Sequence, residues 1–254
     1  MAEFKVSLDG QAAIVTGAGG GLGRAFSHAL GVSGARVVAA DFNFAAAEET
    51  AKILRGEGIT IEPFKVDVTS AEQTAALGAF AEKTFGRVDI LLNNAAFMEP
   101  VLQPLLDYPM DVWQRTFDVN LTGPFNCIRA VAPLMKRQKY GRIVNISSGG
   151  AYGASHAYGI SKLGLQGLTS YLAQELAHTG ITINAIAPGM MKTAQGDKAR
   201  ESFDADSLAA IIPLKPYGQP EDLVGALLFL CSDGASWMTG DVLRVDGGWI
   251  KSVI

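Results

Sequence analysis

The stretch "TGAGGGLGRAF", Thr16 to Phe26, follows a short apolar run and leads directly into a helical pattern. Its glycines Gly17, Gly21 and Gly23 have the spacing Gly-x3-Gly-x-Gly, with Leu22 between the last two. Such glycines permit a tight turn, let the backbone approach a pyrophosphate and bring a helix close to a strand. The free N–H groups at the start of the helix favour an anion there. The stretch therefore predicts a strand, a turn and a helix that bind the phosphates of a dinucleotide.

Short apolar runs alternate with longer helical patterns along the rest of the chain. The runs are nearly continuous in hydrophobicity, which is typical of strands buried on both faces of a parallel sheet. The predicted strands are Ala12 to Thr16, Arg36 to Ala40, Thr60 to Val66, Val88 to Leu92, Arg142 to Ile146, Thr182 to Ile186 and Val242 to Val245. We predict a single α/β domain over residues 1–254, a Rossmann-like, doubly wound parallel sheet of about seven strands with helices on both faces. The irregular stretch Met190 to Pro216 is predicted to be a substrate lid.

Asp41 stands at the carboxyl end of the second predicted strand, in "VVAADFN". A carboxylate there can accept hydrogen bonds from both hydroxyls of an adenosine ribose, and it would repel a 2′-phosphate. The segments Ala18 to Leu22 and Phe42 to Phe44 contain no Arg or Lys that could receive such a phosphate. These features favour NAD over NADP as the cofactor, while a turn or capping role for Asp41 stays open.

Two more loops follow predicted strands at the same edge of the sheet. "KVDVTS" contributes Asp67 and Val68, and "LLNNAAF" contributes Asn93 and Ala95. Ligands bind outside the carboxyl ends of the strands in open α/β sheets. We therefore predict that these four residues contact the cofactor, although each polar one could by itself be a cap or a turn former.

A tyrosine and a lysine, Tyr158 and Lys162, are spaced i, i+4 in "AYGISK" and project from one face of a predicted helix. Ser147 and Ser148 end the strand before them. A free phenol has a pKa of ~10, but a neighbouring ammonium favours the phenolate and can lower this value. The set predicts a base that deprotonates a hydroxyl group, with a serine orienting an alcohol or ketone oxygen. On spacing alone, a solvated helix face is the alternative.

The segments "TGAGGGLG", "NNAA", "NIS", "YGISK" and "NAIAPG" closely resemble the classical short-chain dehydrogenase/reductase family, over essentially the whole chain and in family order. The resemblance implies that Tyr158 is the general acid/base and that Lys162 binds the nicotinamide ribose and tunes the tyrosine. Both side chains then lie against the cofactor. It implies that Ser148 positions the substrate oxygen and that Asn120, in "DVNLTGPF", is a fourth active-site residue. It also implies a homotetramer or, failing that, a dimer.

Asn120 has a physical argument of its own, because Pro124 follows it by four residues in a helical pattern. Proline lacks an N–H, so the carbonyl of Asn120 loses its normal helical donor. A buried carbonyl needs another partner, and water is the obvious one. We hypothesise that this carbonyl holds a water that connects Lys162 to solvent, as the resemblance also implies. A plain helix kink at Pro124 is the alternative.

Later in the chain, "APGMMKT" resembles the family segment that holds the nicotinamide carboxamide, which implies that role for Pro188, Met191 and Thr193. Two departures from the family pattern stand out. Ala96 replaces a glycine, which adds a Cβ near the cofactor. The separation of the serine from Tyr158 is shorter than usual, so either of the two adjacent serines can be the catalytic one.

The leading hypothesis is an NAD-dependent dehydrogenase that interconverts a secondary alcohol and a ketone by hydride transfer. An NADP-dependent 3-oxoacyl thioester reductase is the alternative among enzymes. A non-catalytic cofactor-binding protein on the same fold is the alternative from another class. The substrate is predicted only as a moderately apolar small molecule, because Phe97, Met98, Met190 and Met191 are candidate pocket walls.

Composition excludes several other classes. The net charge of −4 over 254 residues is scattered, which disfavours nucleic acid and anionic membranes as partners. Cys127 and Cys231 lie in apolar runs and are predicted to be reduced core thiols. The N-terminus has no apolar signal core, and no run is long enough to span a membrane. We predict a cytoplasmic protein without a metal site.

Overall fold

The computed structural model describes residues 6–99, 103–153, 156–193, 212–214 and 217–250. Within these ranges the chain forms a parallel sheet of seven strands in the order β3-β2-β1-β4-β5-β6-β7. The strands are β1 (Ala12–Thr16), β2 (Arg36–Asp41), β3 (Ile61–Lys65), β4 (Ile90–Asn93), β5 (Gly141–Ile146), β6 (Ile181–Pro188) and β7 (Val242–Val245). The predicted doubly wound α/β fold is confirmed. β1 and β7 have the predicted bounds, and the other strands differ from prediction by one or two residues at an end.

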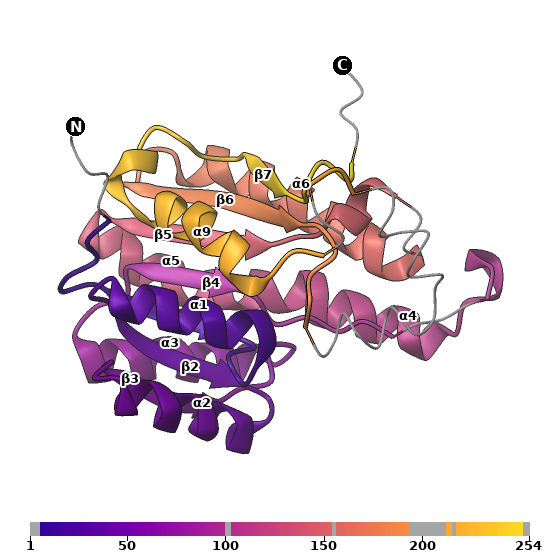
Figure 1. Ribbon diagram of the computed structural model, residues 1–254. Coiled ribbons are helices and arrows are strands. Elements are labelled where there is room, and N and C mark those ends of the chain that lie inside the picture. The colour runs from indigo at the N-terminus through magenta and orange to yellow at the C-terminus, as the bar shows by residue number, and fades with distance from the viewer. Residues whose placement is uncertain (1–5, 100–102, 154–155, 194–211, 215–216, 251–254) are drawn as a thin grey trace.

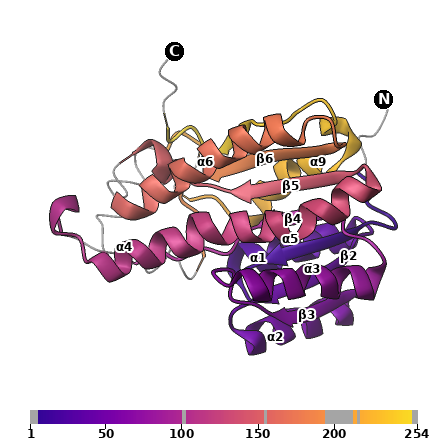
Figure 2. The ribbon, with the colours of Figure 1, turned by 180° about the vertical axis from the view of Figure 1, so that it is seen from behind.

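Helices cover both faces of this sheet. They are α1 (Gly21–Val32), α2 (Phe44–Gly56), α3 (Ala71–Phe85), α4 (Met110–Phe117), α5 (Gly123–Gln138), α6 (His156–Leu176) and α9 (Val224–Cys231). Figure 1 views the face covered by α1 and α9, and Figure 2 shows α3, α5 and α6 on the opposite face. Five short elements complete the described chain: η1 (Leu105–Asp107), η2 (Asp118–Thr122), η3 (Gly149–Tyr152), η4 (Pro220–Leu223) and η5 (Asp233–Ala235).

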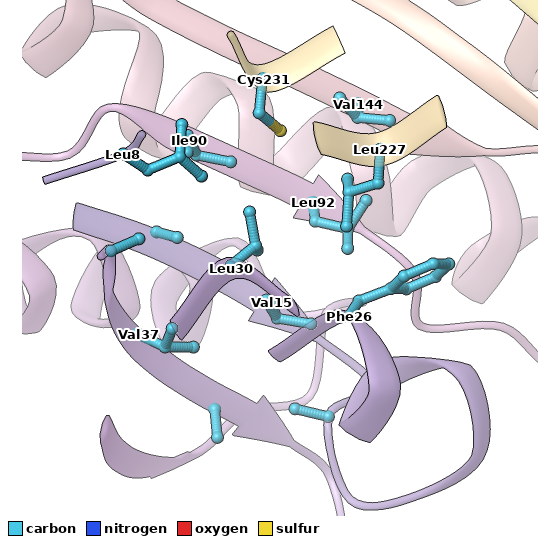
Figure 3. Packing of buried hydrophobic residues seen from close by; sticks show 14 of the residues in the cluster. Leu8, Val15, Phe26, Leu30, Val37, Ile90, Leu92, Val144, Leu227 and Cys231 are labelled. Carbon is cyan, nitrogen blue, oxygen red and sulfur yellow. The ribbon is translucent and has the colours of Figure 1, made fainter. Parts of the chain in front are cut away.

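Strand residues alternate between two apolar cores. On one side of the sheet, Val15 and Leu92 pack with Phe26 and Leu30 of α1 and Leu227 of α9 (Figure 3). The strand residues next to these in sequence, such as Ile14 in β1 and Leu91 in β4, point to the other face of the sheet and pack against α3 and α5. Because the strands are apolar on both faces, they lie in the centre of the protein. Because they are all parallel, their carboxyl ends meet at one edge of the sheet.

The helices that flank the predicted site begin in different ways. The side chain of Asn43 accepts a hydrogen bond from Ala46 N at the start of α2, and that of Ser70 accepts one from Gln73 N at the start of α3. Helix α1 has Gly20 as its N-cap residue, which provides no side-chain hydrogen bond, and no acidic residue lies in its first turn. Its N-terminal N–H groups therefore remain available to an outside acceptor.

Strand order reverses between β1 and β4, since the chain first builds outward to β3 and then returns to the other side of β1. In open α/β sheets such a switch point opens the crevice in which ligands bind. Cys127 and Cys231 are buried and free, as predicted. No helix in the described part of the chain is long and apolar enough to cross a bilayer. Most of the predicted lid, residues 194–211 and 215–216, lies outside the described residues.

Candidate active site

The glycine-rich turn after β1 is as tight as the sequence predicts. Gly17 and Gly21 have φ angles of +66° and +49°, which favour glycine. A Cβ on Gly23 would collide with the carbonyl oxygen of Gly17, so only glycine lets α1 lie this close to the turn. Together with the uncapped start of α1, this cradle fits the pyrophosphate of a dinucleotide. Leu22 lies partly buried in the first turn of α1.

Two residues that the sequence reasoning missed hold this turn against β4. Asn94 donates from Nδ2 to the carbonyls of Thr16 and Gly17, at 2.9 and 3.0 Å. Thr16 Oγ1 accepts from the N–H groups of Asn94 and Ala95, both at 3.1 Å. A Cβ on Gly17 would lie 2.8 Å from the Cα of Ala95. The turn after β1 and the loop after β4, which includes Ala95, therefore form one rigid wall.

Asp41 ends β2 and faces the same turn. Its Oδ2 accepts from the N–H of Gly19 at 2.8 Å, and its Oδ1 accepts from the N–H of Asn43 at 2.8 Å. A Cβ on Gly19 would come within 2.9 Å of Oδ2. The carboxylate is thus fixed in place beside the turn, and it also has the turn-capping role left open by the sequence.

Arg24 is a cation beside the glycine turn that the sequence reasoning missed. It lies in the first turn of α1, outside the segments Ala18 to Leu22 and Phe42 to Phe44, yet its Nη2 donates to the carbonyl of Gly19 at 3.3 Å. Its Nε donates to Thr50 Oγ1 at 3.0 Å. Helical spacing would have found it, because a residue in the first turn of α1 lies over the loop that precedes the helix.

The other predicted cofactor residues lie at the same edge. Asp67 accepts from the N–H and hydroxyl of Thr69 through Oδ1, so it shapes the loop after β3. Val68 is buried, and its carbonyl accepts from Asn126 Nδ2 of α5 at 3.1 Å. Asn93 is buried in β4.

Asn93 belongs to a polar chain through the interior. Its Nδ2 donates to Asn145 Oδ1 of β5 at 2.8 Å, and Asn145 Nδ2 donates to Thr169 Oγ1 of α6 at 2.9 Å. All three side chains are buried. The Oδ1 of Asn93 is buried without a hydrogen-bond partner among the described residues, so only the amide nitrogen of Asn93 takes part in this chain. A buried polar chain of this kind fixes the elements that carry it. We infer that Asn93 sets the position of α6 relative to β4.

On the other side of the glycine turn lies the segment after β6. The side chain of Thr193 lies 3.8 Å from the position that a Cβ on Gly21 would occupy. Met191 is buried and pairs with Gly218 in an isolated parallel bridge. Pro188 ends β6 opposite Val245 of β7. The structure therefore brings the predicted carboxamide segment next to the predicted phosphate turn.

The two serines after β5 have different surroundings. Ser148 is hydrogen-bonded to Tyr158 through its side chain, and its Oγ also accepts from the N–H of Gly150 at 3.0 Å. Ser147 is buried, donates to the carbonyl of Lys162 at 3.2 Å and accepts from Gln166 Nε2 at 2.8 Å. Ser147 therefore joins β5 to α6, and Ser148 faces the tyrosine.

Tyr158 and Lys162 lie on one face of α6, with Lys162 Nζ 5.6 Å from the centre of the tyrosine ring. Burial raises the pKa of Tyr158, an effect that its hydrogen bond with Ser148 opposes. Burial lowers the pKa of Lys162 to about 7. This differs from the expectation that a charged Lys162 lowers the pKa of the phenol, because desolvation acts on both groups. Lys162 Nζ donates to the carbonyl of Ile146 at 2.8 Å.

Asn120 lies in a π-helical turn, η2, between α4 and α5, where the sequence suggested one continuous helix. The N–H of Gly123 donates to the carbonyl of Asp118, a spacing of five residues. Because Pro124 lacks an N–H, the normal bond to the carbonyl of Asn120 cannot form, and the wider turn accommodates the proline.

The side chain of Asn120 ties this turn to the rest of the site. Its amide exchanges two hydrogen bonds with the backbone of Phe97, at 2.8 and 2.9 Å. It also donates to Ser161 Oγ at 3.0 Å, and Ser161 donates to the carbonyl of Tyr158 at 2.7 Å. Ser161 is a further residue that the sequence reasoning missed, although it lies inside the quoted "AYGISK". Asn120 is thereby linked to the helical turn that carries the tyrosine.

The described residues contain no cluster of three or more His, Cys, Asp or Glu side chains able to hold a metal ion. The side chains that converge at this edge are a phenol, an amine, a hydroxyl and a carboxamide. Such a set can transfer protons and orient an oxygen.

Comparison with known proteins adds independent evidence. A family model described as enoyl-(acyl carrier protein) reductase matches residues 17–250. A 3-oxoacyl-[acyl-carrier-protein] reductase of Synechocystis is 38% identical over 252 residues, which cover 96% of this chain and 98% of the relative.

Two solved structures are similar over nearly the whole chain. A 7α-hydroxysteroid dehydrogenase complexed with NADH and 7-oxo glycochenodeoxycholic acid has a TM-score of 0.93 at 33% identity, covering 100% of both chains. An actinorhodin polyketide ketoreductase with NADPH has a TM-score of 0.91 at 32% identity, covering 95% of this chain and 98% of that one. Structures this similar thus hold either cofactor.

Proposed function

Because the chain belongs to the classical short-chain dehydrogenase/reductase family, we propose that it is an NAD-dependent oxidoreductase that interconverts a secondary alcohol and a ketone. The observation that supports this most is the hydrogen-bonded pair of Ser148 and Tyr158 beside the buried amine of Lys162. A bound nicotinamide cofactor supplies the hydride acceptor or donor. The side chains of this chain remove the proton from the substrate hydroxyl or return it to the ketone oxygen.

Tyr158 removes the hydroxyl proton of the alcohol, or returns it to the ketone oxygen. Ser148 orients that oxygen by a hydrogen bond, and we assign this role to it rather than to Ser147 because the hydroxyl of Ser147 is engaged with Lys162 and Gln166. The protonated form of Lys162 stabilises the phenolate form of Tyr158. Gly17, Gly21, Leu22 and Gly23 would hold the pyrophosphate at the start of α1.

Asp41 supports the preference for NAD. Its carboxylate is held beside Gly19, where it can accept from ribose hydroxyls and repel a 2′-phosphate. The second candidate, an NADP-dependent reductase of 3-oxoacyl thioesters, is favoured by the similarity to the Synechocystis enzyme and by the position of Arg24 at the carbonyl of Gly19. The two candidate functions differ in whether Asp41 or Arg24 contacts the adenosine ribose of the cofactor.

A fluorescence titration with NADH and NADPH separates them. We expect wild type to bind NADH more tightly, and Asp41→Ala to weaken NADH binding by roughly 10- to 100-fold, the equivalent of one or two charge-assisted hydrogen bonds. Asp111→Ala, which removes an exposed carboxylate on α4, is the matched control. Tighter binding of NADPH, lost in Arg24→Met, would support the thioester reductase instead. Binding of neither nucleotide would contradict both candidates.

The π turn at Asn120 supports the proposed proton path from Lys162 to solvent through a water on the Asn120 carbonyl. Pro124→Ala restores an N–H that can compete for this carbonyl, so we expect a lower kcat and a shifted basic limb of the pH–rate profile. Pro133→Ala is the control, because Pro133 is an exposed proline in the same helix. An unchanged profile in Pro124→Ala would exclude the relay.

The substrate is proposed to be moderately apolar. A mainly apolar cavity of about 300 Å³ is lined by Met190, Met191, Ile212, Leu214 and Val245, and the first four belong to the described ends of the segment proposed as the lid, residues 190–216. A panel of hydroxysteroids, aliphatic secondary alcohols and 3-oxoacyl thioesters tests this proposal, and its first and last members are the substrates that two similar proteins are named for.

We further propose a single catalytic domain that assembles as a homotetramer, or else a dimer, in the cytoplasm. Helices α5 and α6 expose apolar side chains in the single chain: Phe125, Ile160 and Leu163. Exposed apolar groups on neighbouring helices are typical of subunit interfaces. Light scattering measures the mass of the assembly, and cell fractionation its location.

A further inference from the structure

The chain beyond β7 folds into a turn around Asp246. The N–H groups of Gly248 and Ile250 donate to the carboxylate of Asp246, at 2.9 and 3.0 Å. The N–H of Trp249 donates to the carbonyl of Asp246 at 3.2 Å. The turn is pressed against β6, because a Cβ on Gly189 would lie 2.7 Å from the Cα of Asp246. The backbone of Trp249 is therefore held in a defined place beside the site.

The indole of Trp249 lies directly on Gly149. A Cβ on Gly149 would be 2.9 Å from Cζ3 and 3.0 Å from Cε3 of the indole, and 3.3 Å from the carbonyl oxygen of Pro188. The first of these contacts is shorter than a real Cβ makes and the other two are tight, so the ring lies in space that a Cβ at this position would enter. Gly149 is buried and directly follows Ser148. Trp249 thus contacts the residue next to the serine that meets Tyr158.

A second contact joins the same two parts of the chain. The guanidinium of Arg244, in β7, lies 5.7 Å from the ring centre of Tyr152, at the far end of η3. Arg244 also donates from Nη1 to the carbonyl of Ile250 at 3.4 Å. The C-terminal segment therefore holds η3 at both of its ends, at Gly149 and at Tyr152.

The opposite side of the turn faces the proposed substrate cavity. The N–H of Leu214 donates to the carbonyl of Gly247 at 3.1 Å, and Asp246 and Gly247 line the cavity. A Cβ on Gly248 would lie 3.1 Å from Pro213. The segment that carries Trp249 is thereby packed between η3 and the described end of the proposed lid.

We propose that Trp249 is a positioning residue that holds Ser148 in hydrogen-bonding geometry with Tyr158, acting through its contact with Gly149. This inference rests on the proposed roles of Ser148 and Tyr158. Gly149 has the backbone freedom of a glycine, so without the indole the start of η3 has more conformations to sample. A hydrogen bond weakens steeply when its angle is lost, and small misplacements at a reacting centre have large effects on rate.

The test compares kcat with the Kd for NADH in a set of variants. Trp249→Ala is expected to lower kcat on the order of 10- to 100-fold and leave the Kd for NADH unchanged. Trp249→Phe keeps an aromatic ring over Gly149 and is expected to restore most of the activity. Trp237→Ala is the control, because Trp237 is fully exposed at 101%. Should Trp249→Ala not fold, Trp249→Leu carries the same expectation.

A double variant tests whether the effect passes through Gly149. Gly149→Ala places a methyl group against the indole and is expected to lower kcat. In Gly149→Ala/Trp249→Ala the methyl group no longer meets a ring, so we expect a kcat no lower than that of Trp249→Ala. If the fold-loss of kcat in the double variant equals the product of the losses in the two single variants, the proposal is overturned. Such a product means that the two residues act independently, because independent sites have additive effects on the free energy of activation.

Hydrogen exchange of residues 147–153 supplies a measurement that needs no substrate. The N–H groups of Gly150 and Ala151 donate to Oγ and the carbonyl of Ser148. We expect faster exchange at these amides in Trp249→Ala and wild-type exchange in Trp237→Ala. Unchanged exchange in Trp249→Ala overturns the positioning role. If the wild type turns over no alcohol or ketone, the proposed function fails, and the exchange result still decides whether Trp249 holds the serine.

Discussion

The variant Tyr158→Phe is expected to turn over ~10²- to 10⁴-fold more slowly than the wild type, the contribution typical of a positioned general acid or base. The phenol oxygen is the only part removed, and it is the atom that meets Ser148. Binding of NADH should weaken by no more than about fivefold, the equivalent of one hydrogen bond. A loss confined to kcat would assign Tyr158 to the chemical step.

Tyr171→Phe is the matched control for this measurement. It makes the same change in the same helix, α6, at a side chain that is 78% exposed and lies more than three turns from Tyr158. We expect wild-type kcat and wild-type binding of NADH. An active Tyr158→Phe, measured on a substrate that the wild type oxidises, would contradict the acid/base assignment and leave the cofactor site standing.

The fold follows from the sequence because its strands are apolar on both faces. Continuous apolar runs such as "AAIVT" are typical of strands buried in a parallel sheet, and β1 has its predicted bounds. The predicted strand starts two residues before β4, at Val88, because the apolar run begins there. The N–H of Val88 instead donates to Gln138 Oε1 of α5 at 3.0 Å. A side chain 50 residues away competes for that N–H, and no local pattern contains this information.

The site was predictable where a residue type is required by geometry. Gly23 had to be a glycine because the carbonyl of Gly17 fills the place of its Cβ, and the spacing in the sequence records this. The choice between Ser147 and Ser148 was not predictable. Both follow the same strand, and only the tertiary contacts of α6 show that Lys162 and Gln166 engage the first while Tyr158 meets the second.

The shifted pKa values of Tyr158 and Lys162 also could not be predicted from the sequence. Spacing alone shows that Tyr158 and Lys162 share a helical face, and it suggests a charged lysine beside a phenol. Burial changes this, because Lys162 is 2% exposed and desolvation opposes its charge. The depth of a side chain depends on what packs over it, and that is a property of the whole fold.

This burial predicts a large effect on stability in the protein without added cofactor. The pKa of Lys162 is lowered to about 7 in the folded chain, against ~10.4 for an ordinary lysine. Between these values the unfolded chain binds a proton that the folded chain does not, so the free energy of unfolding rises with pH. Below about pH 7 both states are protonated, and the destabilisation by the buried charge has its full size.

Replacement of Lys162 by methionine removes this titration. We expect the free energy of unfolding of the wild type to rise, relative to that of Lys162→Met, by on the order of 3–4 kcal/mol between about pH 6.5 and pH 10. Lys162→Met also leaves the carbonyl of Ile146 without its 2.8 Å donor, a loss that lowers stability equally at every pH. The difference between the two pH profiles, measured by urea unfolding, therefore isolates the amine.

Lys52→Met is the control for this comparison, because Lys52 is exposed on α2 and its replacement should give a profile parallel to that of the wild type. Parallel profiles for Lys162→Met and wild type would mean that the amine is solvated or ion-paired in the folded chain. A rise in the free energy of unfolding with pH that is present in the wild type and absent from Lys162→Met would instead show that the fold lowers the pKa of this amine towards about 7. Such an amine can exchange its proton with a water near pH 7, and the proposed relay from Tyr158 to solvent requires this property.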